Sequence, residues 1–474
     1  MRALRKPRIG LAGMMCTPFR GDKDTRFRTH RAALETLADR LGFDLHAVEA
    51  GIYTQEQSVA AARELHDWGA DFIVLQASSF AAGSFIYPFV ELRRRLGVWA
   101  VPEGAPTSEG GLPLNSFTSA NMYNSILRTQ RTGYGQPVKW FWGDPGQPLF
   151  DARLETTVRA LRALVNLSGA RIGLIGGVAP GFDNLIVDED KLKTLLGVDL
   201  IQLDLDDLLR GAREADPSRA SQVAAEIRES ATTFDEAQSE ALGKSGRVSL
   251  ALQELAEAHD LQALAVSCWP RFQSHYGLAV CSVMGHLNTS GLIAACEGDA
   301  ASAVSMLTLR FLTQGDVVTL MDLATLDPDD ESILLWHCGP TSPALADARG
   351  ARMGSLWLFD GPEGKRIGLH NDLVLRPGAV TVAGFTVDFD GMLVLDGVVD
   401  NTKPGYAGSG AWLRSLRLNA QPVSVAELVQ TLMASGFQHH YPLAYGHLAE
   451  PIRELCRWMG IHPIQVQPLT TSVL

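Results

Sequence analysis

Residues 8–13 have the sequence RIGLAG and residues 171–176 have the sequence RIGLIG; each run is a short apolar strand that ends in glycine. A second pair of matching runs follows in the same order, LGFDL at residues 41–45 and LGVDL at residues 196–200. Two matches in one order indicate that the chain contains two domains of similar construction.

Helix and strand patterns alternate through the first of these domains. The predicted strands lie at residues 8–13, 43–49, 72–76 and 98–102, and the predicted helices between them lie at residues 29–41, 55–68 and 88–96. Such alternation is typical of a parallel sheet with helices on its faces. The glycines after the first strand lack the third glycine of a dinucleotide-binding fingerprint, so a tight turn is the simpler interpretation.

The pattern changes from about residue 353, where short alternating strands replace helices and Asp390-Gly391 gives a strong hairpin signal. An amphipathic helical pattern returns near residues 448–459. We therefore predict an α/β protein with two doubly wound parallel-sheet domains, residues 1–168 and 169–345, followed by a β-rich, barrel-like C-terminal domain with a closing helix, residues 346–474.

The composition is that of an ordinary globular protein, with 46% apolar and 20% charged residues among 474. The net charge of −12 argues against nucleic acid as a partner. No apolar run approaches the roughly 20 residues of a membrane span, and the N-terminal residues lack the apolar core of a signal peptide. We expect a cytoplasmic protein that does not bind membranes.

The chain has six cysteines, and none of them forms a C-x-x-C pair. Sparse cysteines in a long chain are typical of reduced thiols in the cytosol. Four of the six, Cys268, Cys281, Cys296 and Cys338, fall in one region, which makes a zinc site conceivable. Their irregular spacing favours buried structural thiols over a zinc site.

Two carboxylates in the stretch 291–339 are the best candidates for chemistry. Glu297 follows Ala-Ala-Cys and precedes an apolar helix, so we expect it to be buried, and a buried carboxylate needs a partner or a metal ion. Asp299 has a simpler interpretation as a favourable charge at the N-terminus of that helix. Asp322 ends an apolar strand, where a functional role and the capping of a turn are equally open.

Three histidines complete the candidates. His337 lies in an apolar strand, where a hydrogen-bonded core histidine is more common than a metal ligand. His439 and His440 are adjacent, so on extended backbone they would point in opposite directions and only one would face a given site. Two carboxylates and one imidazole would suit Mn²⁺ or Mg²⁺ better than zinc.

Several motifs, in order, resemble the L-fucose isomerase and L-arabinose isomerase superfamily, more closely its fucose isomerase branch. They are CWP at residues 268–270, CEGDAASAVSM at 296–306, LMDL at 320–323, WHCG at 336–339 and GFQHHYPLAYGHLAEPIRELCRWMGI at 436–461. The resemblance implies two wound domains and a barrel-like domain. It also implies a homo-oligomer with its site near a subunit interface.

The resemblance further implies a metal-dependent aldose–ketose isomerase that moves a proton between C1 and C2 of a monosaccharide through an enediolate. Glu297, Asp322 and His440 match the family's metal ligands, commonly for Mn²⁺, with Mg²⁺ or another divalent ion as alternatives. Glu297 and Asp322 would also carry the proton, in an order that stays open.

Four further residues are candidates for substrate binding: Arg20, Trp269, His337 and His439. Arg20 could contact the far end of the sugar from a neighbouring subunit, and Trp269 could stack on the sugar, although an exposed charge and plain packing are equally simple interpretations. The alternative function is a catalytically silent sugar-binding protein made of two wound lobes, which would need no metal ion.

Overall fold

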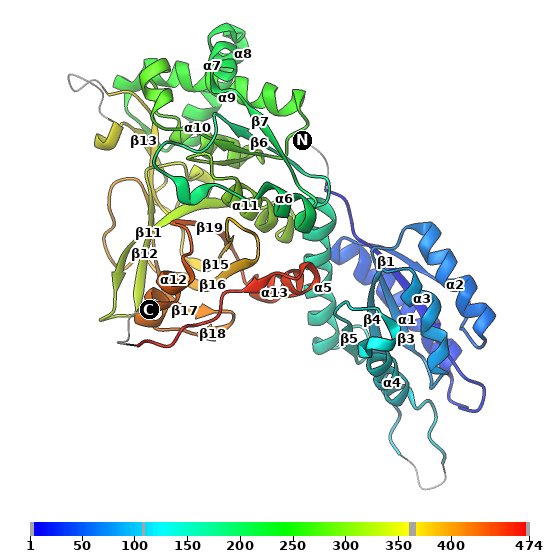
Figure 1. The fold of residues 1–474 in the computed structure, drawn as a ribbon. Helices are drawn as coiled ribbons and strands as arrows, with labels where there is room; N and C mark the ends of the chain where they lie inside the picture. Colours follow the sequence, from blue (N-terminus) through cyan, green and yellow to red (C-terminus); the bar gives the residue numbers. More distant parts are fainter. Residues whose placement is uncertain (1–3, 107–109, 360–365, 471–474) are drawn as a thin grey trace. The chain divides into compact units, whose positions relative to one another are not determined.

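The computed structural model describes residues 4–106, 110–359 and 366–470. It divides into two compact units, one of residues Arg5–Val165 and one that contains Asn166 and the residues after it. The second unit contains both a wound α/β domain and a β-barrel. The predicted fold class is thereby confirmed: two parallel-sheet α/β domains and a C-terminal barrel (Figure 1).

The first unit is a five-stranded parallel sheet in the order β2-β1-β3-β4-β5. Its strands are β1 (Arg8–Met14), β2 (Asp44–Ala47), β3 (Phe72–Ala77), β4 (Arg95–Ala100) and β5 (Lys139–Trp142). Its helices are α1 (Lys23–Leu41), α2 (Gln55–Trp68), α3 (Tyr87–Glu91), α4 (Ser116–Arg128) and α5 (Pro148–Leu167). The predicted helix 88–96 was too long, because Arg93 takes a left-handed φ of 53° and β4 begins two residues later.

The second unit opens with a four-stranded parallel sheet in the order β10-β9-β6-β7. The strands are β6 (Arg171–Ile175), β7 (Asp199–Leu203), β9 (Ala263–Val266) and β10 (Ile293–Ala295). The longer helices of this domain are α7 (Leu205–Glu214), α8 (Pro217–Ser230), α9 (Ser239–Ala258), α10 (Cys281–Ser290) and α11 (Ala300–Leu312).

Helix α11 is apolar on almost every side because it is covered on almost every side. It contacts β9 and β10 of the wound sheet and also β15 (Gly378–Phe385) and β19 (His440–Tyr445) of the barrel. Twelve of its thirteen residues are buried. Helix α11 is therefore held between the two sheets of this unit and against the strand that begins with His440.

Six antiparallel strands close the barrel in the cyclic order β16-β15-β19-β11-β12-β17. The remaining bounds of this ring are β11 (Thr319–Asp327), β12 (Ser332–His337), β16 (Gly391–Val399) and β17 (Ser409–Leu418). Helices α12 (Val425–Ser435) and α13 (Ala449–Met459) follow in the same C-terminal region. The ring includes β11 and β12, which precede residue 346, the predicted start of the C-terminal domain. The predicted domain limits stay predictions.

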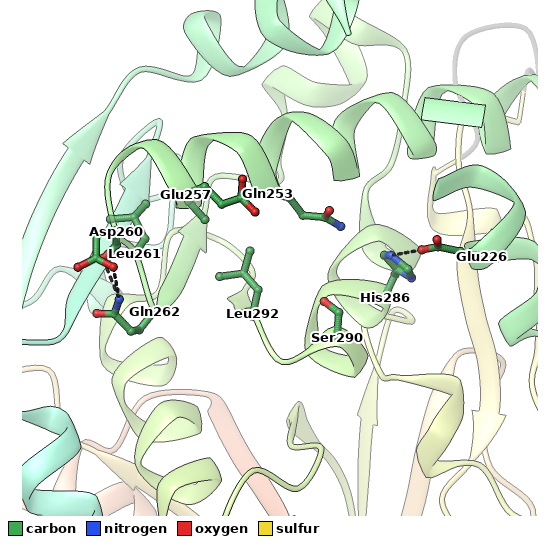
Figure 2. A pocket seen from close by; sticks show the side chains of 10 residues that line it. Glu226, Gln253, Glu257, Asp260, Leu261, Gln262, His286, Ser290 and Leu292 are labelled. Atoms are coloured by element: carbon green, nitrogen blue, oxygen red, sulfur yellow. Dashed lines mark hydrogen bonds and ion pairs between the residues drawn. The ribbon is translucent and has the colours of Figure 1, made fainter. Parts of the chain in front are cut away.

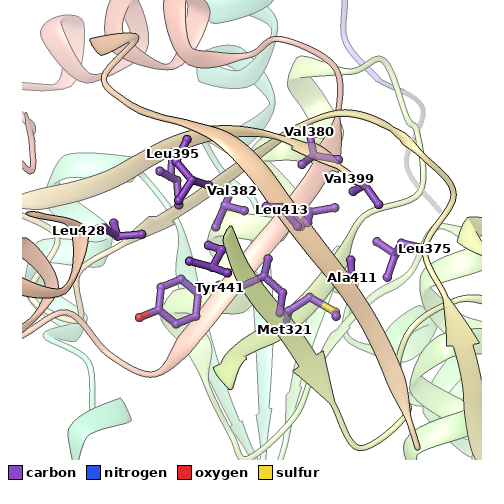
Figure 3. Packing of buried hydrophobic residues seen from close by; sticks show 14 of the residues in the cluster. Met321, Leu375, Val380, Val382, Leu395, Val399, Ala411, Leu413, Leu428 and Tyr441 are labelled. Atoms are coloured by element: carbon purple, nitrogen blue, oxygen red, sulfur yellow. The ribbon is translucent and has the colours of Figure 1, made fainter. Parts of the chain in front are cut away.

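Asp322 lies inside β11 and does not end it, so our expectation for its position was wrong. The strand continues to Asp327 because β11 pairs with β12 along this part of its length. Met321 belongs to the hydrophobic core of the barrel, as does Tyr441, its register partner on β19 (Figure 3). Side chains alternate along strands, so Asp322 and His440, which are also register partners, point away from this core.

Among residues 4–106, 110–359 and 366–470, no helix combines the length and the apolar character that a membrane crossing requires.

Candidate metal centre

The structure brings Glu297, Asp322 and His440 together, although they come from three different elements. Nε2 of His440 lies 3.5 Å from Oε2 of Glu297 and 3.8 Å from Oδ1 of Asp322. The His440 side chain has no exposed surface, whereas those of Glu297 and Asp322 keep 18% and 28% exposed. The two carboxylates thus line the approach to a buried imidazole.

An unusual backbone turn between β10 and α11 positions Glu297. Glu297 has a left-handed φ of 60° and Gly298 follows with 73°; only glycine adopts this region without cost, so the conformation of Glu297 is strained. The turn is held by backbone hydrogen bonds from Ala179 N to the Glu297 carbonyl, at 2.9 Å, and from Gly298 N to the Val266 carbonyl, at 3.0 Å. This strained turn directs the carboxylate of Glu297 toward His440.

Asp299 fixes the orientation of the His440 ring. Its Oδ1 caps α11 by accepting from Ser302 N at 2.8 Å, and its Oδ2 accepts from Nδ1 of His440, also at 2.8 Å. Because Nδ1 carries the proton, Nε2 faces the two site carboxylates with its lone pair. Our prediction of a helix-terminal role for Asp299 is confirmed by the cap, but the sequence alone did not indicate its contact with His440.

The expectation that only one of His439 and His440 faces the site was wrong. Nε2 of His439 lies 3.1 Å from Oε2 of Glu297, the same oxygen that His440 approaches. His439 lies in a bend before β19 begins, so strand alternation does not apply to it. The hydrogen bond and the charge of Glu297 outweigh partial burial and raise the pKa of His439.

The pKa of His440 reflects opposing influences. Burial lowers it most strongly, but the hydrogen bond and the charge of Asp299, together with the charge of Asp322, outweigh burial, and the net result is a raised pKa.

The arrangement fits a hard divalent cation. Oδ1 of Asp322 is buried and lacks a hydrogen-bond partner among the described residues. A buried, unpaired carboxylate oxygen destabilises the fold unless a cation or a hydrogen-bond donor lies next to it. Around an octahedral ion with ligand bonds of about 2.1 Å, neighbouring donors lie about 3 Å apart and opposite donors about 4.2 Å. The separations of 3.5 Å and 3.8 Å fall between these two values, so small movements of the side chains would bring the three donors to an octahedral ion.

His337 lies behind this site and is buried, as the sequence suggested. Its Nε2 is 3.1 Å from Sγ of Cys296, while the backbone N–H of Cys338 donates to its Nδ1 at 2.8 Å. Burial lowers the pKa of His337, and the charge of Asp322 raises it, with a net value of about 9. In the neutral ring, the bond from Cys338 requires a lone pair on Nδ1, so the proton of that form lies on Nε2.

Two candidates remain, Trp269 and Arg20. Trp269 is 45% exposed, so a stacking surface is available. Arg20 is exposed in the segment after β1 and belongs to the compact unit Arg5–Val165. The substrate-binding roles of both residues stay predictions.

A cavity of about 420 Å³ lies elsewhere in the second unit, between α9 and α10 (Figure 2). Its lining includes the carboxylates of Glu226, Glu257 and Asp260, and the His286 ring lies 4.0 Å from Glu226. Three acids would repel an anionic sugar intermediate. The cluster around His440 is therefore the better candidate for the active site.

Comparisons with known proteins agree with an isomerase. No protein-family model matches the chain. The chain is 28% identical over 421 residues to the sulfoquinovose isomerase of Priestia megaterium, covering 86% of this chain and 90% of that protein. It is 28% identical over 409 residues to the sulfoquinovose isomerase of Alkalicoccus urumqiensis, covering 84% and 86% of the two chains.

The structural comparison is weak. A glucose-galactose binding protein from Geobacillus stearothermophilus shares 12% identity and covers 66% of this chain and 93% of its own, at a TM-score of 0.17. A score this low supports no inference, so it does not favour the sugar-binding alternative. The fucose isomerase branch stays a prediction, but the similarity to sugar isomerases spans most of the chain, and we conclude that the protein is an enzyme of the aldose–ketose isomerase class.

Proposed function

We propose that the protein is a metal-dependent aldose–ketose isomerase that moves a proton between C1 and C2 of a sugar through an enediolate. The observation that carries this proposal is the convergence of Glu297, Asp322 and His440, with Nε2 of His440 3.5 Å and 3.8 Å from the two carboxylates. A divalent ion, Mn²⁺ or Mg²⁺, held by them would neutralise the negative charge that develops on the two sugar oxygens.

Glu297 and Asp322 have the chemistry to carry the proton. Removing a proton beside a carbonyl needs a base close to one carbon, and returning it needs an acid close to the neighbouring carbon. Both carboxylates are partly exposed, so a sugar can approach them from solvent. We propose them as this acid–base pair without fixing which removes the proton first.

The imidazoles support the carboxylates in different ways. His440 is fixed by Asp299 and offers only Nε2 to the site. His439 donates to Oε2 of Glu297 at 3.1 Å, and its raised pKa keeps that nitrogen protonated over a wider pH range. A protonated His439 would orient the Glu297 carboxylate and hold it ionised.

We propose a sulfonated sugar as the substrate, because the relatives that match most of the chain are named sulfoquinovose isomerases. Arg20 is our candidate for the sulfonate contact, since a guanidinium group donates two parallel hydrogen bonds to such an anion. In this proposal the enzyme is a homo-oligomer, and Arg20 comes from a neighbouring subunit.

The substrate is tested with a matched pair, sulfoquinovose and quinovose, which differ only in the sulfonate. With Mn²⁺ present, we expect the enzyme to convert sulfoquinovose with a KM far below its KM for quinovose. Arg20→Gln should raise the KM for sulfoquinovose and leave the KM for quinovose unchanged. Arg63 is an exposed arginine on α2, and Arg63→Gln should change neither KM. Equal KM values for the two sugars would contradict the sulfonate proposal but not the isomerase.

The chemistry is tested by isomerisation in D₂O, where proton transfer through an enediolate incorporates deuterium at the reacting carbon. Glu297→Gln and Asp322→Asn should each lower kcat by about 10²- to 10⁴-fold. Asp329→Asn, an exposed aspartate on the loop between β11 and β12, is the matched control and should retain full activity. Full turnover by Glu297→Gln, or activity unaffected by a chelator, would contradict the proposed mechanism.

A further inference from the structure

Two thiols and one imidazole that the proposed isomerase chemistry does not use lie close to His440. Sγ of Cys296 is 3.1 Å from Nε2 of His337 and 3.7 Å from Nε2 of His440. The thiol of Cys268 makes a hydrogen bond with that of Cys296 and accepts from Glu297 N at 3.4 Å. We call Cys268, Cys296, His337 and His440 the thiol–imidazole cluster.

The spacing of this cluster matches tetrahedral metal coordination. Zinc bonds sulfur at about 2.3 Å and imidazole nitrogen at about 2.0 Å, which places neighbouring S and N donors about 3.5 Å apart. The two measured S···N distances, 3.1 Å and 3.7 Å, lie on either side of that value. Ligand atoms of Cys296, His337 and His440 all lie within 4.8 Å of one another. Cys268, in contact with Cys296, is a candidate for the fourth position.

His337 must change its tautomer to take part. Its proton now lies on Nε2, because the backbone N–H of Cys338 donates to Nδ1. A proton on Nδ1 would have an acceptor, since Sγ of Cys338 lies 3.1 Å from that nitrogen, while the Cys338 N–H would give up its bond to the ring. Metal binding would therefore release the thiol proton of Cys296 to solvent and move the His337 proton from Nε2 to Nδ1.

His440 makes this cluster and the carboxylate site mutually exclusive. Its Nδ1 is occupied by Asp299, so Nε2 is the only nitrogen that it can offer to a metal ion. The same Nε2 lies 3.5 Å and 3.8 Å from oxygens of Glu297 and Asp322 and 3.7 Å from Sγ of Cys296. One ion at a time can use it.

We propose that the thiol–imidazole cluster is a second, overlapping metal site, which binds a thiophilic divalent cation such as Zn²⁺ through Cys296, His337 and His440 and thereby displaces the ion of the carboxylate site. Thiolate and imidazole ligands select Zn²⁺ and similar ions, whereas carboxylates favour Mg²⁺ and Mn²⁺. The thiol–imidazole site stands independently of the proposed function, and only the displacement rests on it.

The binding is tested on the full-length, reduced protein with Cd²⁺, whose thiolate complexes absorb in the ultraviolet. We expect a thiolate-to-cadmium absorption that saturates at one equivalent. Cys296→Ala should weaken binding at least about tenfold, and so should His337→Gln, which removes no thiol. Cys456→Ala is the matched control: its buried thiol contacts the Met392 sulfur at 3.6 Å instead of an imidazole, and its removal should change nothing.

The displacement is tested on the wild-type protein by the electron paramagnetic resonance of free Mn²⁺, which should rise as Zn²⁺ is added. Unchanged Cd²⁺ absorption in both the Cys296 and His337 variants would overturn the thiol–imidazole site. Zinc binding through sulfur without release of Mn²⁺ would overturn the shared use of His440. A protein that binds Cd²⁺ as expected but never binds Mn²⁺ would contradict the proposed function and leave the second site standing.

Discussion

Oδ2 of Asp299 accepts a hydrogen bond from Nδ1 of His440 at 2.8 Å, and neither side chain has any exposed surface. A carboxylate behind a histidine fixes the tautomer and makes the opposite nitrogen a better metal ligand. Asp299 also caps α11 through its other oxygen. One buried aspartate therefore joins the start of a helix to the ligand of the candidate metal site.

Asp299→Asn should separate these two roles. Asparagine caps helices about as well as aspartate, so the free energy of unfolding should change little. The substitution also removes the negative charge that faces Nδ1 of His440, and this loss should weaken Mn²⁺ binding about 10- to 100-fold. Titration calorimetry and denaturant unfolding measure the two effects. Asp216→Asn, at the N-terminus of α8, removes a comparable charge from a cap and should leave Mn²⁺ binding unchanged.

Mn²⁺ binding should weaken as the pH falls. A metal ion requires the unprotonated Nε2 of His440, and the pKa of His440 is raised, mainly by Asp299 against the effect of burial. Protonation therefore begins above the ordinary histidine pKa of about 6.5, and below the raised pKa each pH unit should lower the apparent affinity up to about tenfold. In Asp299→Asn the decline should begin at lower pH. An affinity that stays constant from about pH 8 to about pH 6 would exclude a histidine ligand of raised pKa.

His439→Ala should lower kcat/KM about tenfold, because a hydrogen bond to a charged group contributes about 1.5 kcal/mol or more. The bond that is lost is the one from Nε2 to Oε2 of Glu297, at 3.1 Å. His439→Gln can still donate to Glu297 and should recover part of the loss. Steady-state kinetics of both variants check this; equal activity of the wild type and His439→Ala would show that His439 does not orient Glu297.

Gly298→Ala should both destabilise the protein and disrupt the site. The left-handed φ of 73° costs alanine about 1 to 2 kcal/mol, and a Cβ at this position would also overlap the carbonyl oxygen of Gly177. Gly436→Ala has a similar φ of 62° but no atom within 4 Å of its Cβ, so it isolates the backbone effect. Urea unfolding should show the larger loss for Gly298→Ala, together with weaker Mn²⁺ binding; equal losses would mean that the turn relaxes.

The sequence by itself determined the fold class, because hydrophobic periodicity and turn residues are local signals. The alternation through residues 8–102 and the Asp390-Gly391 hairpin depend on residues close together in the chain. The sequence also singled out Glu297, since a carboxylate between buried segments is costly without a partner.

Only the tertiary structure decided which groups meet. Asp322 and His440 are register partners on β11 and β19, and their pairing depends on how the barrel closes, which no local pattern encodes. The hydrogen bond from His440 to Asp299 and the contact of Cys296 with two histidines likewise join residues far apart in the chain. Side-chain function in this protein is set by long-range strand pairing and by the packing of α11 between two sheets, whereas the order of its elements is set locally.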